Sequence, residues 1–334
     1  PQTMLDLHCC PPVFFMTPTG PPDHPMWPKS NRKWANRSLD IAQKEFGKRG
    51  YSMSSGMDYA GITYLGHGIT WGLLGPTISG QMFESIGGVP ALRRSDGSVV
   101  TIKDGIERHI IGTRAVMKNL SENKQELLKD AYNLSINSAE EAREASVRGA
   151  VIPAEGPNVD QTKLKRLLDR LELQGIEINK ATEPFTVEGR PFFDLNSKTE
   201  REFPAGTYYV DFVQPYSRLA RSVLDPTQQT PIPQVDPRNE RESPFYDSQV
   251  QNLPLLFGVN AYTIDQDIPS VQHEAFQSFD LENSVAEADT DTPYGYVLPA
   301  GKESSYKVAV NLMQDDYKVR VFKGPFINNE TKYE

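Results

Sequence analysis

The chain has 334 residues, of which 38% are hydrophobic and 24% are charged, and its formal net charge at pH 7 is −9. This composition is typical of a globular protein with about two domains. The acidic balance, without any basic run, argues against nucleic acid as a partner. No apolar segment reaches the roughly 20 residues that a membrane-spanning helix needs.

The first predicted strand, residues 3–8, ends in His8 and leads into a proline-rich loop. A histidine at the end of a central strand is placed to face a cleft, although a lone histidine is more often a structural residue than a metal ligand. Cys9 and Cys10 are adjacent, so they predict no disulfide framework. Residues 31–50 are expected to form a helix because their apolar side chains recur at helical spacing.

Residues 62–86 are a glycine-rich stretch that leads into a short strand. A glycine-rich backbone can approach a ligand closely, which favours a role as the wall of a site. The run Thr77–Phe83 is expected to be a buried strand that is closed by Glu84. A carboxylate in this position is placed like a catalytic acid or base. The plainer alternative is a strand-end carboxylate that lies in solvent or in a salt bridge.

Four features follow one another in a recognisable order: the strand end LDLH, a helix, the loop TYLGHGITW and a strand that ends in MFE. This order resembles the C-terminal half of a zinc carboxypeptidase catalytic domain. The segment RRSDGSVVTIKDGIERHIIGT, which starts at Arg93, resembles the strand, turn and helix that follow in bacterial members with large C-terminal extensions. The resemblance covers residues 3–120 and implies an α/β fold, namely the C-terminal half of a mixed sheet with helices.

The resemblance also implies roles for individual residues. His8 would be one zinc ligand, Glu84 the general base, and Tyr64 the tyrosine that caps the substrate, while Trp71 matches a loop tryptophan and His67 has no metal role. Zinc with three protein ligands lowers the pKa of a bound water and polarises the scissile carbonyl. The implied substrate is a peptide or another amide, and the implied location is secreted or periplasmic.

The zinc site that this resemblance implies is incomplete in the sequence. The family's other two ligands belong to an HxxE motif upstream of the LDLH strand, and this sequence contains no HxxE or HxxH. One ligand is too few for a catalytic zinc. We therefore expect that the N-terminal half of the domain is missing and that this chain alone is inactive. The alternative is a non-catalytic binding or scaffold protein that keeps the fold. An unrelated α/β hydrolase is disfavoured, because neither a G-x-S-x-G elbow nor a P-loop is present.

Residues 103–148 predict two successive helices, with Ser121 as the N-cap of the second. Six residues are expected to form the core stripe of the first helix: Ile106, Ile110, Ile111, Val116, Met117 and Leu120. Gly149 marks the expected boundary between a partial carboxypeptidase-like catalytic domain, residues 1–148, and a second domain, residues 149–334.

An apparent internal repeat of strand, helix and strand begins at Val151 and again at Tyr296. Such units predict a mostly parallel, open sheet. The second domain, including FPAGTYYVDFVQPYSRLARSVLDP from Phe203, also resembles the flavodoxin-like, glutamine-amidotransferase-like domain appended to some bacterial zinc carboxypeptidases. It contains no cysteine, so the amidotransferase nucleophile is absent and a structural or substrate-orienting role is expected. The sequence does not determine the oligomeric state.

Overall fold

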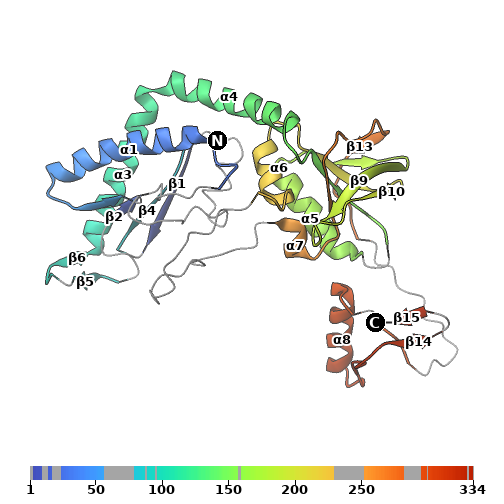
Figure 1. The fold of residues 1–334 in the computed structure, drawn as a ribbon. Coiled ribbons are helices and arrows are strands. Elements are labelled where there is room, and N and C mark those ends of the chain that lie inside the picture. The colour runs from blue at the N-terminus through green and yellow to red at the C-terminus, as the bar shows by residue number, and fades with distance from the viewer. Residues whose placement is uncertain are drawn as a thin grey trace.

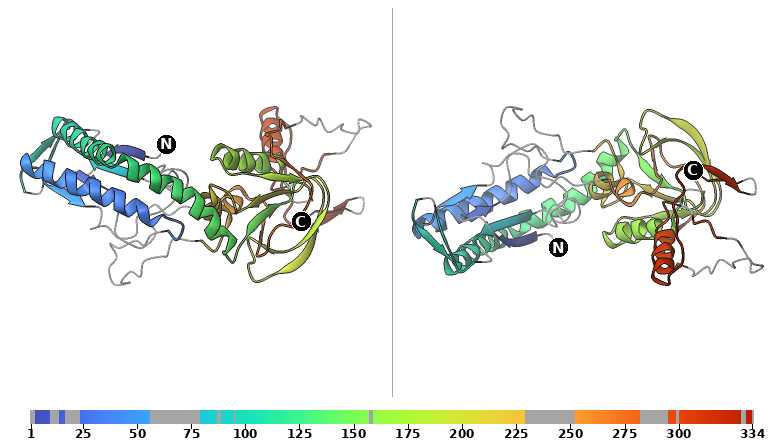
Figure 2. Two further views of the ribbon diagram at one scale, coloured as in Figure 1. Left: turned by 90° about the horizontal axis from the view of Figure 1, so that it is seen from above. Right: turned by 90° about the horizontal axis from the view of Figure 1, so that it is seen from below.

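The structure is a computed structural model in which two lobes lie at opposite ends of one long helix, α4 (Figures 1 and 2). The structure describes the following residues: 3–9, 14–16, 24–55, 79–86, 89–94, 96–156, 159–228, 252–281, 295–298, 300–328 and 331–333.

The first lobe is built on a mixed sheet with the strand order β1-β4-β2-β3. Its strands are β1 (Thr3–Cys9), β2 (Phe14–Met16), β3 (Met53–Ser55) and β4 (Ser79–Ser85). β1 is parallel to β4, β2 is antiparallel to β4, and β3 is parallel to β2. The expected mixed α/β architecture is therefore present, and β4 lies in the interior of the sheet.

Two helices, α1 (Lys29–Lys48) and α3 (Ile102–Glu122), pack together on one face of this sheet. The predicted apolar stripe of α1 is confirmed, since Trp34, Leu39, Ala42 and Phe46 are buried. The buried cluster that joins the helices to the sheet contains Leu39, Ala42, Phe46, Phe83, Ile111, Ala115 and Val116. The predicted core stripe of α3 is partly wrong, because three of its members, Ile106, Ile110 and Met117, are exposed.

A two-stranded ribbon, β5 (Ala91–Arg93) with β6 (Val99–Thr101), leads directly into α3. Thr101 is the N-cap of α3 and forms a reciprocal capping box with Asp104. The Asp104 carboxylate accepts hydrogen bonds from the Thr101 hydroxyl at 2.6 Å and from the Thr101 amide at 2.7 Å. These bonds hold the pKa of Asp104 below its usual range and satisfy donors that a helix start would otherwise leave unpaired.

We expect Thr101→Ala to reduce the free energy of unfolding by about 1 kcal/mol, because the N-cap acceptor is lost. Urea denaturation followed by circular dichroism measures this change. Thr101→Ser keeps the hydroxyl and should stay close to wild type. Equal losses in both variants would show that the cap is not the source of the effect.

α4 (Lys124–Arg143) follows α3 after Asn123 and connects the two lobes (Figure 1). The restart of the helix therefore lies two residues after the predicted position, Ser121. α4 is bound to α1 by the ion pairs of Glu126 with Arg37 and of Lys33 with Asp130. No helix among the described residues is both long and apolar enough to cross a membrane.

The second lobe contains a seven-stranded sheet with the order β10-β9-β12-β7-β11-β8-β13. Its strands are β7 (Gly149–Ile152), β8 (Asn179–Ala181), β9 (Phe185–Pro191), β10 (Thr199–Phe203), β11 (Tyr208–Asp211), β12 (Tyr262–Ile264) and β13 (His273–Ala275). All six neighbouring pairs are antiparallel. The predicted parallel, flavodoxin-like sheet is therefore wrong.

The reason for this error lies in the placement of β11. The predicted first strand and helix are present as β7 and α5 (Gln161–Leu173), whereas the second strand, predicted at residues 175–178, is wrong in position, because β8 begins directly after them at Asn179. However, β11 inserts between β7 and β8 and pairs antiparallel with both. β7 and β8 thus point in the same direction without being neighbours. The local pattern cannot reveal that a strand from later in the chain separates them.

The predicted second repeat is also absent. α8 (Glu303–Gln314) confirms its helix, but residues 295–298 and 317–321 are not strands. The chain instead continues to a ribbon of β14 (Phe326–Asn328) with β15 (Thr331–Tyr333). The start of α8 is held against α5, because Lys163 donates to the carbonyl of Gly301 at 2.9 Å.

The sheet of the second lobe has a buried cluster on each face. One cluster joins it to α5, α6 (Ser217–Leu224) and α7 (Leu253–Phe257) and includes Leu164, Leu168, Phe212, Leu219 and Val223. The other includes Val151, Phe185, Val187, Phe203, Tyr209 and Ile264. Side chains that alternate along each strand supply the two clusters in turn, as in β7, where Ile152 and Val151 belong to different clusters.

Candidate functional site

The register of β1 with β4 brings His8 and Glu84 together. In this parallel pair, His8 lies opposite Glu84, and each is the second-last residue of its strand. The His8 Nδ1 atom is 3.7 Å from the Glu84 Oε1 atom. The matched order of the two residues predicts that they end neighbouring strands with their side chains turned into one cleft. The neighbouring strand ends are confirmed, and the shared cleft stays a prediction.

The alternation of side chains shows which face carries the pair. Phe83 is fully buried against α1 and α3, and its register partner Leu7 also faces α3. Successive side chains of a strand point to opposite faces. His8 and Glu84 therefore lie on the face that is turned away from α1 and α3.

The pair is partly shielded from solvent. The side chain of Glu84 is 21% exposed and that of His8 is 47% exposed. A separation of 3.7 Å is longer than an ordinary hydrogen bond, so the contact is electrostatic and requires a protonated imidazole to be attractive. On its other side, Glu84 lies opposite Phe15 of β2 in an antiparallel pair. Glu84 thus belongs to an interior strand that has a neighbour on both edges.

His109 is a residue of this region that sequence reasoning missed. It lies on α3, and its ring is hydrogen-bonded to the backbone of His8. Burial lowers the pKa of His109 from its ordinary value, so the ring is neutral at pH 7. The contact joins α3 to the end of β1 from the face opposite the His8 side chain. No local pattern indicates a contact between residues 101 positions apart.

The described residues do not complete a metal site. Among them there is no group of three or more His, Cys, Asp or Glu side chains able to hold a metal ion. A catalytic zinc needs three protein ligands, whereas the pair offers one imidazole and a carboxylate. The described donor set therefore supplies only part of the ligands of a catalytic zinc. Tyr64, His67 and Trp71 lie outside the described residues.

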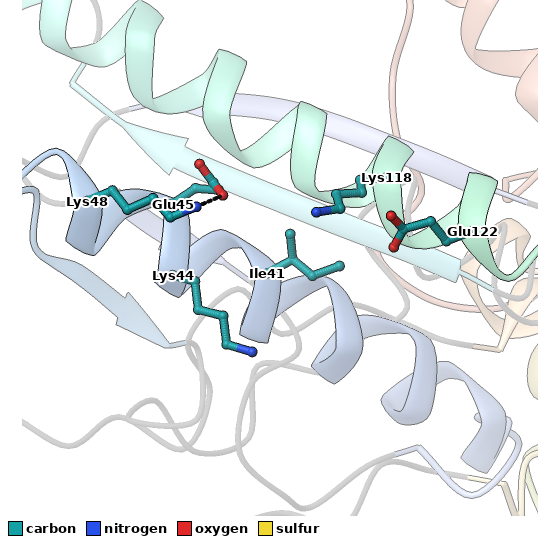
Figure 3. Close-up of a pocket in the computed structure, with 6 residues that line it drawn as sticks. All are labelled: Ile41, Lys44, Glu45, Lys48, Lys118 and Glu122. Atoms are coloured by element: carbon teal, nitrogen blue, oxygen red, sulfur yellow. Dashed lines mark hydrogen bonds and ion pairs between the residues drawn. The ribbon is translucent and has the colours of Figure 1, made fainter.

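Two of the surface hollows in the described part of the first lobe lie along its helices, and neither is lined by His8 or Glu84. One, of about 450 Å³, lies along α1 and α3 (Figure 3) and is lined by Ile41, Lys44, Glu45, Lys48, Lys118 and Glu122. The other, of about 530 Å³, is lined by Leu7, Ile106, His109, Ile110, Thr113 and Arg114. Both involve the helices, so neither lies on the face of the sheet that carries the pair.

Comparisons of this chain with family models, with curated proteins and with solved structures found no match. The geometry of the His8–Glu84 pair is therefore the main structural support for a function.

Proposed function

We propose that this chain carries part of a zinc-dependent, carboxypeptidase-type hydrolytic site in which Glu84 is the general base and His8 is one zinc ligand. The proposal is supported by the register of β1 with β4, which brings together two residues 76 positions apart in the sequence. The substrate class is a peptide or another amide. The remaining zinc ligands would come from residues other than those that the structure describes.

Glu84 can perform the proton transfers of amide hydrolysis. Its carboxylate would take a proton from a water molecule as the water oxygen bonds to the amide carbonyl carbon. The same proton would then pass to the leaving nitrogen as the carbon–nitrogen bond breaks, which yields a carboxylic acid and an amine. General acid–base catalysis of this kind contributes typically 10²- to 10⁴-fold. When bound, zinc would supply Lewis acidity toward the carbonyl and the water.

The test is Glu84→Gln, made in a polypeptide that contains this chain together with the remaining zinc ligands. We expect kcat/KM for peptide hydrolysis to fall at least about 100-fold, because the amide cannot accept the proton. Zinc content, measured by atomic absorption, should stay unchanged, because Glu84 is not a ligand. His8→Ala should instead reduce the zinc content.

Asp6→Asn is the matched control, because Asp6 lies on β1 two residues before His8 and therefore on the same face of the sheet. It should leave hydrolysis close to wild type. Near wild-type turnover by Glu84→Gln would remove Glu84 from the mechanism. A polypeptide that neither binds zinc nor hydrolyses any peptide would favour the binding or scaffold alternative.

A further inference from the structure

Residues 24–28, which immediately precede α1, form a strap between the two lobes. The Met26 side chain is buried in the same cluster as Leu219 and Val223 of α6, which belongs to the second lobe. The strap therefore enters the second lobe, although the helix that follows it packs in the first. α1 begins at the end of the first lobe that lies nearest α6 (Figure 1).

Arg218 of α6 fastens the strap to the second lobe and to α4. Its Nη1 atom donates to the Met26 carbonyl at 3.2 Å, and its Nη2 atom donates to both carboxylate oxygens of Glu141 on α4, each at 2.6 Å. One guanidinium thus connects the strap, the long helix and the second lobe. Bonds of this kind to charged groups are stronger than neutral hydrogen bonds.

His24 completes the docking of the strap, and it is 1% exposed. Its Nδ1 atom accepts a hydrogen bond from the Met26 amide at 3.1 Å, and its Nε2 atom contacts the Gln228 carbonyl at 3.1 Å. An amide N–H can only donate and a carbonyl can only accept. The docked ring must therefore be neutral, with its proton on Nε2 and a lone pair on Nδ1.

We propose that the strap is a pH-dependent latch between the two lobes, which opens when His24 takes up a proton on Nδ1. Protonation would make Nδ1 a hydrogen-bond donor. It would then face the Met26 N–H, which is also a donor, so the hydrogen bond between them would be lost. The imidazolium would also be buried, which is costly without an anionic partner.

Burial and the bond to the Gln228 carbonyl are the influences on the charge of His24, and the charged groups near the strap interact with other residues. Arg218 of α6 donates to the Met26 carbonyl of the strap, and Arg221 of α6 interacts with Asp225 and Glu141. Glu141 is bound to Arg218, and the Asp225 carboxylate accepts from the amide and hydroxyl of Thr227. Burial lowers the pKa of His24 to about 4, and the bond to the Gln228 carbonyl acts in the opposite direction.

The expected pH dependence follows from proton uptake on release. A released His24 titrates with an ordinary pKa of about 6.5. Above that pH neither state is protonated and the latch has its full strength. Between about pH 6.5 and pH 4, release of the strap takes up one proton, so its equilibrium constant rises by up to tenfold for each pH unit lost. Over this range the equilibrium constant for release rises on the order of 300-fold. Below about pH 4 both states are protonated, and the constant no longer depends on pH.

The strap lies close in sequence to β2, the strand that pairs with β4 beside the candidate base Glu84. The strap begins eight residues after Met16, the last residue of β2, and β2 pairs with β4 at Glu84. Docking of the strap thus fixes His24, which lies eight residues along the chain from the strand that flanks Glu84. The inference of a latch itself rests on His24 and Arg218, so it stands independently of the proposed hydrolytic function.

Amide hydrogen exchange of the full chain tests the latch. The Met26 amide donates to His24, and the Trp27 amide donates to the His24 carbonyl at 2.8 Å. After correction for intrinsic exchange, we expect the protection of both amides to fall by up to tenfold per pH unit between pH 6.5 and 4. Amides in the centre of α5 should keep their protection over the same range and report that the second lobe remains folded.

His24→Asn is the matched variant, because it keeps an acceptor near the Met26 amide and cannot titrate. In this variant, the protection of the Met26 and Trp27 amides should not change between pH 6.5 and 4. Equal slopes in both proteins would overturn the proposal, as would constant protection in the wild type. An independent measurement is the titration of the His24 ring by nuclear magnetic resonance. A His24 pKa near 4 supports the latch. A His24 pKa near 6.5 would contradict it, irrespective of the exchange result for His24→Asn.

Discussion

Replacement of Phe83 by alanine is expected to reduce the free energy of unfolding of the first lobe by about 3–5 kcal/mol. Phe83 is fully buried in the interior strand β4 and belongs to the cluster that joins the sheet to α1 and α3. Loss of the ring removes buried apolar surface and leaves a cavity that the helices cannot fully close. Urea denaturation followed by circular dichroism measures the change.

Leu7→Ala provides a matched control, because Leu7 is the register partner of Phe83 on β1. Leu7 is 56% exposed, so its truncation should cost no more than about 0.5 kcal/mol, as for other exposed positions. A similar loss in both variants would mean that the cluster under β4 does not carry the stability of this lobe. The same measurement also bears on the candidate site, because Phe83 directly precedes Glu84.

Replacement of Trp34 by alanine is the second large effect that we expect, again about 3–5 kcal/mol. Trp34 is fully buried on α1 and clusters with Leu127 of α4. Its indole Nε1 atom donates to the Asp130 carboxylate at 3.1 Å. Truncation would therefore weaken the contact of α1 with the helix that connects the lobes. Thermal unfolding followed by circular dichroism reports the loss.

Two further variants separate the contributions of Trp34. Trp34→Phe keeps most of the buried surface and removes the indole donor, so it should cost about 1 kcal/mol for the lost hydrogen bond, in addition to a smaller packing loss. Tyr132→Ala truncates an aromatic side chain of α4 that is 68% exposed, and it should have little effect. A large loss in Tyr132→Ala, or none in Trp34→Ala, would contradict the assignment of the core between α1 and α4.

The sequence predicted a helix or strand correctly where the residues of that element alone determine its conformation. Helical spacing of apolar residues predicted α1, α5 and α8, because each helix presents one face to its neighbours. The strands that carry His8 and Glu84 were predicted from short apolar runs bounded by glycine or proline. Their adjacency was expected from the resemblance to zinc carboxypeptidases, and the parallel register of β1 with β4 agrees with that expectation.

The stripe of α3 shows where periodicity fails. This helix has apolar residues on two faces, and the exposed face contains Ile106, Ile110 and Met117, while Ile111 and Val116 are buried. Both faces satisfy a helical pattern, so the pattern does not show which one meets the sheet. That choice depends on the packing of α1 and β4 against the helix.

By itself, the sequence determined the α/β class, most of the helices and the two strands that bear the candidate pair, since these features depend on local spacing and composition. Only the tertiary structure decided the rest. β11 inserts between β7 and β8 and makes the second sheet antiparallel. His109 contacts the backbone of His8, and His24 docks on the second lobe beside Gln228, 204 residues later. These contacts join distant residues, and their formation depends on which surfaces the folded elements bury against one another.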